Sequence, residues 1–388
     1  EVSYLVKTIK QAVDQEHVDL SAKVSSLNAN LSCVMVFGKK GFKSIGQEVV
    51  HLAATPNLGD FFPYLGVLDL QGITDRLKAL SRVFDEFLEK IIGHAQSKEQ
   101  RETKDFVDTM MDIMQSGEAG FKFDRSHVKA VLLNILPCFS LVSASICFSL
   151  SQGFYLPQTP LLSTIAPEGS VVVQLTFVVT NFGLQDMLMA SMDTSATSVE
   201  WILTELLRHP HVMKKLQKEL EEVVGIDRMV EESDLKNLSY LDMVIKEALR
   251  LHSAAPLLIH DYIEDCVVDG FFVQKGSRVI VNVYAAQRDP NAWPEPDKFL
   301  PERFVGSSVD LRGHDFQLLP FGSGRRSCLG MQLGIIIVRL VVAQLVHCFN
   351  WELPNGIPPS DLDMTEQFGV VTYREKHLMA IPTYRLQL

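Results

Sequence analysis

Hydrophobic and polar positions follow a helical period along most of the chain. From residue 1 to about residue 130 the pattern predicts helices that each keep one polar face. Residues 199–207 and 211–224 predict two amphipathic helices on either side of Pro210, because proline disfavours helical geometry in the residue before it. A further helix is predicted over residues 240–251. The chain is therefore expected to be dominated by helices.

The hydrophobic period shortens to two beyond these helices. Residues 266–273 and 278–283 alternate around glycine-containing turns, which predicts short antiparallel strands. Residues 331–349 are apolar on almost every side, so a helix buried in the core is predicted there. The expected fold is mainly α with a small β region.

Composition narrows the possible functions. The chain has 388 residues, and 47% of them are hydrophobic, which is enough to form a large core. A formal net charge of -11 leaves no broad basic surface for a phosphate backbone, so nucleic-acid binding is not expected. The six cysteines include no CxxC pair, which favours a reducing environment without a disulfide framework. The residues after Glu1 show no signal or anchor pattern, so no membrane anchor is expected in this sequence.

The composition changes abruptly in the middle of the chain. Glu168 is the only charged residue between Leu133 and Asp186. The uncharged run 131–150 is as long as a membrane-spanning helix, but its proline and many serines weigh against that interpretation. Residues 171–179 have the composition of a strand.

Residues 134–185 therefore have the character of an insertion. Joining Leu133 directly to Asp186 would give the continuous helical pattern AVLLDMLMASMDTSAT. We predict that 134–185 are translated non-coding sequence. A genuine additional loop is the alternative.

The most informative chemistry lies in the segment FGSGRRSCLG at residues 321–330, directly before the apolar helix. Its glycines allow backbone conformations and close approaches that other residues cannot adopt, as a loop pressed against a flat macrocycle requires. Cys328 would then present its sulfur to a metal. A buried free thiol is the alternative, since free cysteines are commonly buried.

This segment resembles the haem-binding loop of cytochromes P-450, which reads Phe-x-x-Gly-x-Arg-x-Cys-x-Gly. Phe321, Gly324, Arg326, Cys328 and Gly330 match all five positions. The resemblance implies that these residues bind haem b, with the Cys328 thiolate as the axial ligand of the iron and Arg326 beside a haem propionate.

The same resemblance implies further contacts around the cofactor. His260 is the basic residue after the apolar turn 253–259, and it is expected to reach a propionate. The turn itself and the loop 368–370 are expected to approach the substrate.

Two segments upstream of the cysteine complete a charged motif of the family. KEALRLH contains Glu247 and Arg250, which share one face of a helix, and FLPERF contains Arg303. Alone, the first pair would be read as a solvated salt bridge. The resemblance implies instead a buried network of all three residues that supports the cysteine loop and matters for folding and haem retention.

The segment ASMDTS at residues 190–195 resembles the oxygen-activating part of the family's long central helix. The resemblance implies that Asp193 and Thr194 relay protons in a water-poor pocket. Ser191 stands where the family usually has glycine, which puts the local geometry in doubt. An ordinary helix cap is the alternative for Asp193 and Thr194.

The chain resembles the plant microsomal branch of the family. This resemblance implies a haem-thiolate monooxygenase that inserts one atom of O2 into an apolar small molecule. Because the chain has no nicotinamide- or flavin-binding motif, NADPH-cytochrome P-450 reductase is the expected electron donor. The resemblance also implies the cytochrome P-450 fold, with residues 1–388 as a single haem-enclosing unit that lacks the N-terminal anchor and early helices of the family. The full-length family member is expected at the cytosolic face of the endoplasmic reticulum membrane. Two alternatives remain: a catalytically inactive, truncated or misassembled product, and an O2-independent haem-thiolate isomerase or dehydratase.

Overall fold

The computed structural model describes only part of the chain: residues 1–11, 17–37, 191–367, 369 and 371–387, with isolated positions between 71 and 112. These residues fall into two compact units. The first unit comprises Glu1–Asn28 together with Asp193–Leu388, and the second comprises Ala29–Met192. The predicted insertion 134–185, and with it the predicted segments 131–150 and 171–179, lies outside the described residues.

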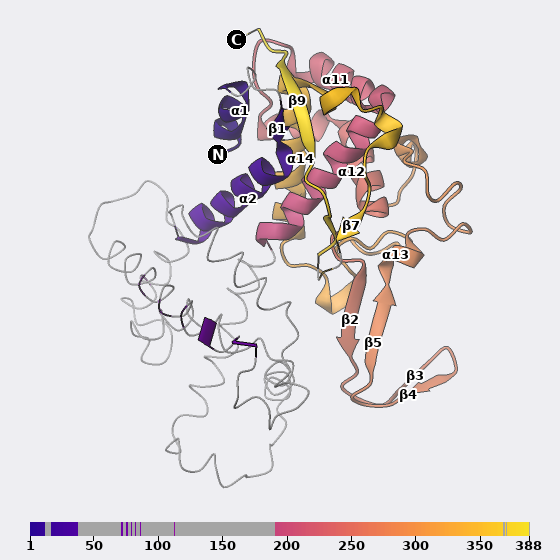
Figure 1. Ribbon diagram of the computed structural model, residues 1–388. Helices are drawn as coiled ribbons and strands as arrows, with labels where there is room; N and C mark the ends of the chain where they lie inside the picture. The colour runs from indigo at the N-terminus through magenta and orange to yellow at the C-terminus, as the bar shows by residue number, and fades with distance from the viewer. Residues whose placement is uncertain are drawn as a thin grey trace. The chain divides into compact units, whose positions relative to one another are not determined.

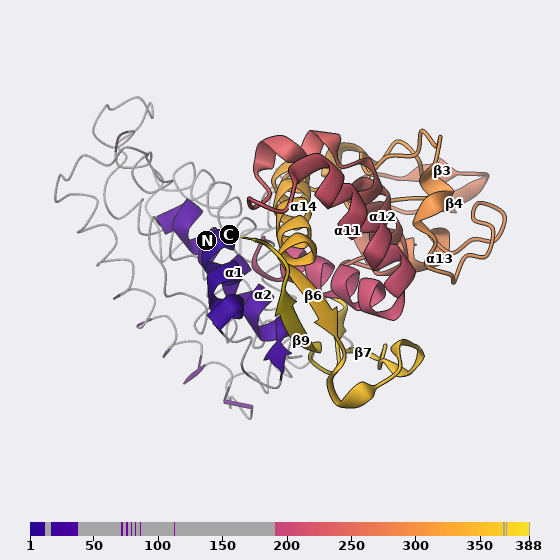
Figure 2. The same ribbon diagram turned by 90° about the horizontal axis from the view of Figure 1, so that it is seen from above.

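Four helices build the core of the first unit: helix 191–208, α11 (Pro210–Val224), α12 (Ser239–Leu251) and α14 (Met331–Cys348). Pro210 occupies the first turn of α11, where its missing N–H is not needed. The buried faces of α11 and α12 follow the predicted helical period. Both helices pack against α14 and lie beside it in Figure 1 and Figure 2.

A three-stranded sheet joins the two ends of the chain. Its order is β1 (Val18–Asp19), β9 (Met379–Tyr384) and β6 (Phe349–Glu352), and both pairs are antiparallel. Val18 lies opposite Ala380, and Phe349 lies opposite Tyr384. The N-terminal helices α1 (Val2–Gln11) and α2 (Leu20–Phe37) flank β1 in sequence.

Three two-stranded ladders complete the β structure. They are β2 (Leu257–Asp261) with β5 (Arg278–Asn282), β3 (Cys266–Val268) with β4 (Phe271–Val273), and β7 (Glu366–Gln367) with β8 (Tyr373–Arg374). The two-residue turn between β3 and β4 has positive φ at Asp269 and Gly270, as a tight hairpin requires. Figure 1 shows this hairpin beyond the far end of β2 and β5.

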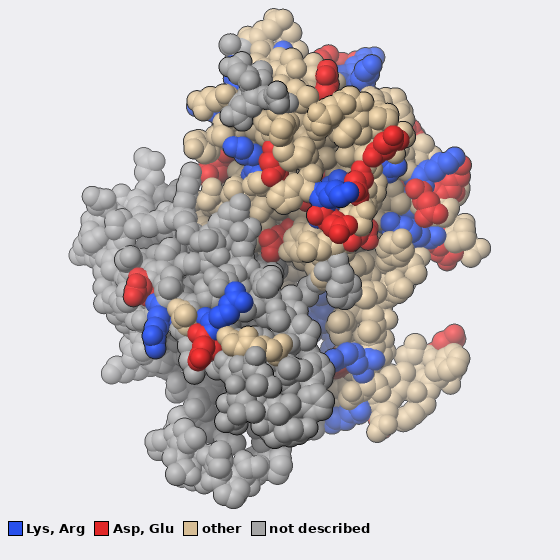
Figure 3. All heavy atoms as spheres, viewed as in Figure 1, with Lys and Arg blue, Asp and Glu red and all other residues tan. Residues whose placement is uncertain are grey.

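Short helical turns connect these elements. They are η1 (Glu232–Asn237), α13 (Val283–Ala286), η2 (Pro301–Phe304), η3 (Gly324–Arg326), η4 (Pro354–Gly356) and η5 (Pro359–Asp361). On the face drawn in Figure 3, described acidic and basic side chains lie in small mixed groups. Lys218 and Glu222 on α11 form an exposed ion pair, with their charged atoms 3.6 Å apart.

The prediction of a mainly helical fold with a small β region is confirmed for the described residues. One expectation was wrong. Helix α14 is buried only from about Val338 onward, whereas its first two turns, which follow directly on the exposed cysteine loop, are half-exposed. Among the described residues α14 is also the single helix long and apolar enough to cross a membrane, and half of it is buried within the protein.

Candidate functional site

The cysteine loop, residues 321–330, forms a tight turn ahead of α14. The Cys328 N–H donates to the Phe321 carbonyl at 2.8 Å, and the Ser327 N–H donates to the Gly324 carbonyl at 3.1 Å. Gly324 has a φ of 69°, in the left-handed region that favours glycine. The hydrogen bonds close the turn, and the side chain of Cys328 is exposed.

The end of the loop leaves space around the thiol. Gly330 is the N-terminal cap of α14, and a Cβ atom placed on it would lie 3.9 Å from the Cys328 sulfur. Leu329 is fully exposed, and Leu333 on the first turn of α14 is also exposed. The loop therefore presents a thiol amid apolar side chains at its surface.

Gly313, which lies outside the motif, packs closely against the backbone of the cysteine loop. Gly313 has a φ of 80°, and its carbonyl accepts a hydrogen bond from the Ser323 hydroxyl at 2.6 Å. A Cβ atom on Gly313 would lie only 2.4 Å from the Gly322 carbonyl oxygen. The close approach leaves no room for a side chain at this position. Sequence reasoning missed Gly313, because an isolated glycine carries no motif.

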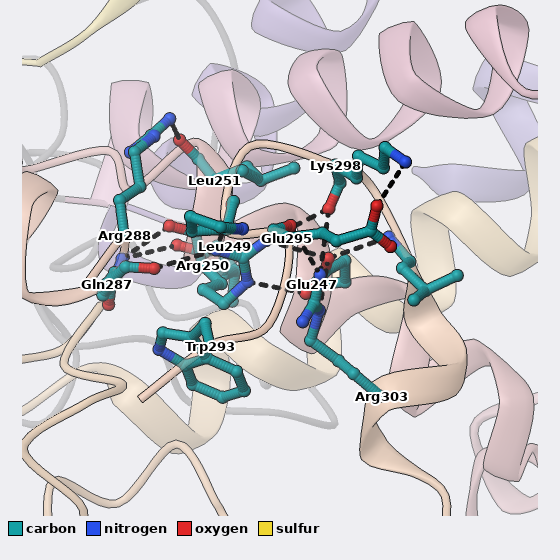
Figure 4. Close-up of polar contacts among 12 residues, drawn as sticks. Glu247, Leu249, Arg250, Leu251, Gln287, Arg288, Trp293, Glu295, Lys298 and Arg303 are labelled. Carbon is teal, nitrogen blue, oxygen red and sulfur yellow. Dashed lines mark hydrogen bonds and ion pairs between the residues drawn. The ribbon is translucent and has the colours of Figure 1, made fainter. Parts of the chain in front are cut away.

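The three predicted network residues meet in the core, as Figure 4 shows. Arg250 forms a two-pronged ion pair with Glu247, with contacts of 2.8 and 2.9 Å. The Arg303 Nε also donates to Glu247 at 2.9 Å. Glu247 and Arg250 are completely buried. The two guanidinium groups and the Leu300 N–H, at 2.8 Å, satisfy the carboxylate.

The remaining donors of the two arginines hold the segment that follows α13. Arg250 donates to the carbonyls of Pro296 and Lys298, and Arg303 donates to the carbonyl of Pro294. Both guanidinium groups also lie over the ring of Trp293, at 5.4 and 5.8 Å from its centroid. Trp293 was missed by sequence reasoning, although tryptophan is the residue most suited to such stacking.

Asp193 and Thr194 lie within helix 191–208, so the alternative that they cap the start of this helix is wrong. The Thr194 carbonyl accepts a hydrogen bond from the Ser198 hydroxyl at 2.8 Å. A Cβ atom on Gly334 would lie 3.8 Å from the Ser195 hydroxyl, so this helix touches the first turns of α14 close to the cysteine loop.

Asp193 has a partner that the sequence did not indicate. The pKa of the Tyr373 phenol on β8 is raised by burial, and further by the charge of Asp193 and a hydrogen bond to it. Ser191, placed in doubt above, lies with its hydroxyl 2.8 Å from that of Ser32 on α2. The Asp193 carboxylate and the Ser191 hydroxyl thus each have a polar partner.

The two predicted cationic residues are exposed. His260 lies on β2 opposite Val279, and Arg326 ends the short turn η3. Within the described ranges neither side chain forms a hydrogen bond or ion pair with another residue. Strand β2 lies against the loop, since a Cβ atom on Gly322 would be 3.6 Å from Leu258. Of the predicted substrate-contacting loop, Phe368 and Val370 lie outside the described residues.

Comparison with known proteins decides the family. A sequence model described as cytochrome P-450 matches residues 1–137 and 173–379. The chain belongs to the cytochrome P-450 family. Its plant relatives include cytochrome P-450 CYP736A12 of Panax ginseng, 45% identical over 401 residues that cover all of this chain and 70% of the relative. Flavonoid 3′-monooxygenase of Petunia hybrida is 34% identical over 406 residues, covering 98% of this chain and 69% of the relative.

Solved P-450 structures share the fold. A zebra fish cytochrome P-450 determined with progesterone superposes with a TM-score of 0.68 at 25% identity, covering 98% of this chain and 75% of that chain. Together with the monooxygenase relatives, this shows that the chain is a P-450 monooxygenase, an oxidoreductase whose cofactor is haem.

The described residues fit a haem. An exposed thiol is a suitable ligand for haem iron, and the glycine beside it leaves the sulfur accessible. The exposed guanidinium groups of Arg325 and Arg326, which have no other partner among the described residues, suit the carboxylates of the propionates. The loop and its surroundings thus offer a thiol for the iron, cations for the propionates and apolar side chains for the ring.

Proposed function

We propose that Cys328 is the axial ligand of the haem iron in this P-450 monooxygenase. The observation that carries the proposal is the exposed thiol at the start of α14, in a loop closed by the hydrogen bond from Cys328 to Phe321. When bound, haem supplies the activation of dioxygen that side chains cannot perform. The protein holds the sulfur and shapes its surroundings.

The rest of the loop seats the cofactor. Phe321 closes the turn through its carbonyl. The absence of a side chain at Gly324 and Gly330 would let a flat macrocycle approach the backbone. Arg326 and His260 neutralise the propionates. Their exposure and lack of other partners within the described chain support these roles.

Asp193 and Thr194, in helix 191–208, would hold and relay the protons that the reaction consumes. A carboxylate and a hydroxyl at adjacent positions can hold a water molecule and pass its proton onward. Tyr373 keeps the Asp193 carboxylate oriented through the hydrogen bond between them. The nearby contact between Ser195 and Gly334 supports this placement beside α14.

Glu247, Arg250 and Arg303 act on folding and haem retention rather than on bond making. Their contacts are buried and complete, and they fix the chain between residues 294 and 300 rather than reach the surface of the loop.

The substrate is an apolar small organic molecule, and O2 supplies the oxygen atom. The electrons come from NADPH through NADPH-cytochrome P-450 reductase. The protein works at the cytosolic face of the endoplasmic reticulum membrane. The name of the Petunia relative supports a monooxygenase reaction on a small plant metabolite, without fixing the substrate of this chain.

Residues 1–388 form one P-450 domain interrupted by the insertion 134–185. The family match supports this proposal, because it leaves residues 138–172 unmatched. If the insertion prevents assembly, the chain as it stands is the inactive product considered above, and deleting 134–185 should restore haem incorporation.

The decisive test is the carbon monoxide difference spectrum of the reduced protein. The full chain and the chain without 134–185 should be measured with the Cys328→Ser variant of each. A long-wavelength Soret band that disappears in Cys328→Ser supports thiolate ligation by Cys328. A band that persists in that variant overturns the assignment, and the absence of a band from both parent proteins overturns the proposed function.

A further inference from the structure

Gln287 connects the buried charge network to the segment that leads into the cysteine loop. It follows α13 directly and is completely buried. Its main-chain carbonyl accepts a hydrogen bond from Arg250 at 2.8 Å. Its side chain makes three further hydrogen bonds, and Figure 4 shows Gln287 beside Arg250 and Leu249. No motif of the sequence includes this residue.

The amide nitrogen of Gln287 binds the end of α12. The last carbonyls of a helix have no partner within it. The Gln287 Nε2 donates to the Leu249 carbonyl at 3.1 Å and to the Arg250 carbonyl at 2.9 Å. The next carbonyl, that of Leu251, accepts from Arg288. Two consecutive side chains thus satisfy three consecutive carbonyls of the helix that carries Glu247 and Arg250.

The amide oxygen of Gln287 binds the segment that leads into the cysteine loop. It accepts the Leu319 N–H at 2.8 Å, in a buried contact. Leu319 lies two residues before Phe321, whose carbonyl accepts the Cys328 N–H. Trp293 supports the same segment, because its indole N–H donates to the Gln317 carbonyl at 3.2 Å. A continuous path of hydrogen bonds and short chain segments therefore leads from α12 through Gln287 to Cys328.

We propose that Gln287 is a positioning residue for Cys328. Its amide holds the 317–319 segment, and with it the Phe321 carbonyl, at a fixed place relative to the Glu247–Arg250 network. A primary amide suits this position because it offers two donors and an acceptor at one end. A glutamate in place of Gln287 would direct a negative charge at the carbonyls of Leu249 and Arg250. A methionine there could form none of the three side-chain hydrogen bonds. The proposal rests on the assignment of Cys328 as the haem ligand.

The test compares Gln287→Met with Gln217→Met in the full chain and in the chain lacking residues 134–185. Gln217 is also buried, and it also donates to carbonyls near a helix end, those of Val346 and Phe349. It makes no contact with the cysteine loop among its described hydrogen bonds. Urea unfolding of both variants measures what each substitution costs in stability, so a difference in haem binding beyond that cost reports position rather than general stability.

Two readouts separate the roles. The rate of haem transfer to apomyoglobin should rise at least about fivefold in Gln287→Met, the factor expected if only one of the three lost hydrogen bonds bears on the cysteine loop, and should change little in Gln217→Met. Gln287→Met should also convert more of its carbon monoxide complex to the short-wavelength form that has lost its thiolate. Equal behaviour of the two variants in both measurements would overturn the proposal.

Hydrogen exchange of the haem-free protein tests the contact independently of Cys328. The amide of Leu319 should exchange at least about fivefold faster in the milder variant Gln287→Asn, whose side chain is too short to span both partners, than in Gln217→Asn. An unchanged rate at Leu319 would overturn the proposal even if the spectral test of Cys328 succeeds. Faster exchange together with a parent protein that shows no long-wavelength band would instead locate the failure in the ligand assignment.

Discussion

Glu247 and Glu205 are both buried carboxylates, at most 3% exposed, but their partners differ in kind. Glu247 faces two arginines and a main-chain N–H, which together satisfy it. Glu205, on helix 191–208, faces two histidines, with His252 Nε2 at 2.7 Å and His209 Nδ1 at 3.2 Å. Arginine remains charged at every pH that a folded protein tolerates, whereas histidine does not.

The difference between the partners determines which buried carboxylate makes a pH-dependent contribution to stability. Burial raises the pKa of Glu205, but the two histidines outweigh burial and lower the pKa to about 2. His252 donates a hydrogen bond to the carboxylate, whereas His209 acts by its proximity, since its Nδ1 bonds the main-chain carbonyl of Glu205. The hydrogen bond to Glu205 raises the pKa of His209. The Nδ1 atom of His252 is buried and has no hydrogen-bond partner in the described part of the chain. The contacts of Glu247 with its arginines are therefore independent of histidine protonation, whereas the contacts of Glu205 with His209 and His252 change with pH.

The largest effect is expected from breaking the arginine network. Glu247→Gln leaves two buried guanidinium groups without their counter-charge, so the free energy of unfolding should fall by roughly 3–5 kcal/mol. Urea unfolding measures the change. Glu222→Gln, which removes only an exposed pair with Lys218, should cost less than about 1 kcal/mol. Similar losses in the two variants would show that the network is not specially stabilising.

A smaller, pH-dependent effect is expected from Glu205→Gln. The folded pKa of about 2 lies below the ordinary value of 4.5, so Glu205 stabilises the fold above about pH 4.5 and loses this contribution as pH falls toward 2. His209 adds stability below its ordinary pKa of 6.5, and this is lost as pH rises through its raised folded value. The variant should be roughly 2–3 kcal/mol less stable near pH 6 and approach the parent toward pH 3.

Urea unfolding of both proteins between pH 3 and pH 8 provides the measurement. A difference that stays constant across this range would contradict the two-histidine account of Glu205. The same series on Glu247→Gln serves as control, because its arginine partners keep their charge throughout.

The smallest effect is expected from Arg303→Lys. Lysine preserves the positive charge facing Glu247 but lacks the planar fork that also reaches the carbonyls of Pro294 and Glu295. The loss should be about 1–2 kcal/mol in thermal or urea unfolding, well below that of Glu247→Gln. A loss as large as that of Glu247→Gln would mean that geometry, and not charge, decides the strength of the network.

Much of the fold could be predicted where a repeating pattern exists. Residues 240–251 alternate with a helical period and form α12, and the Asp269-Gly270 pair predicts the hairpin of β3 and β4. The strand β1 could not be predicted, because two residues have no period and their partner is at the other end of the chain. The burial of α14 was overestimated, since an apolar pattern does not distinguish a core face from a face beside a ligand-binding loop.

For the site, the motif predicted which residues carry the chemistry but not what supports them. Glu247, Arg250 and Arg303 were placed in one network from the family pattern, and the structure brings them together. Gln287, Trp293 and Tyr373 act through contacts with residues distant in sequence, and an isolated polar or aromatic residue carries no periodic signal.

The pairing of β1 with β9 means that the first unit is made from the two ends of the chain. Val18 and Asp19 lie opposite Ala380 and Met379, and the Leu378 N–H donates to the Ser21 hydroxyl at 2.7 Å. The peptide connection through residues 29–192 is therefore not what holds these ends together. A protease that cuts the chain once within that connection should yield two fragments that migrate separately in denaturing gels yet co-elute under native conditions, as a complementing pair.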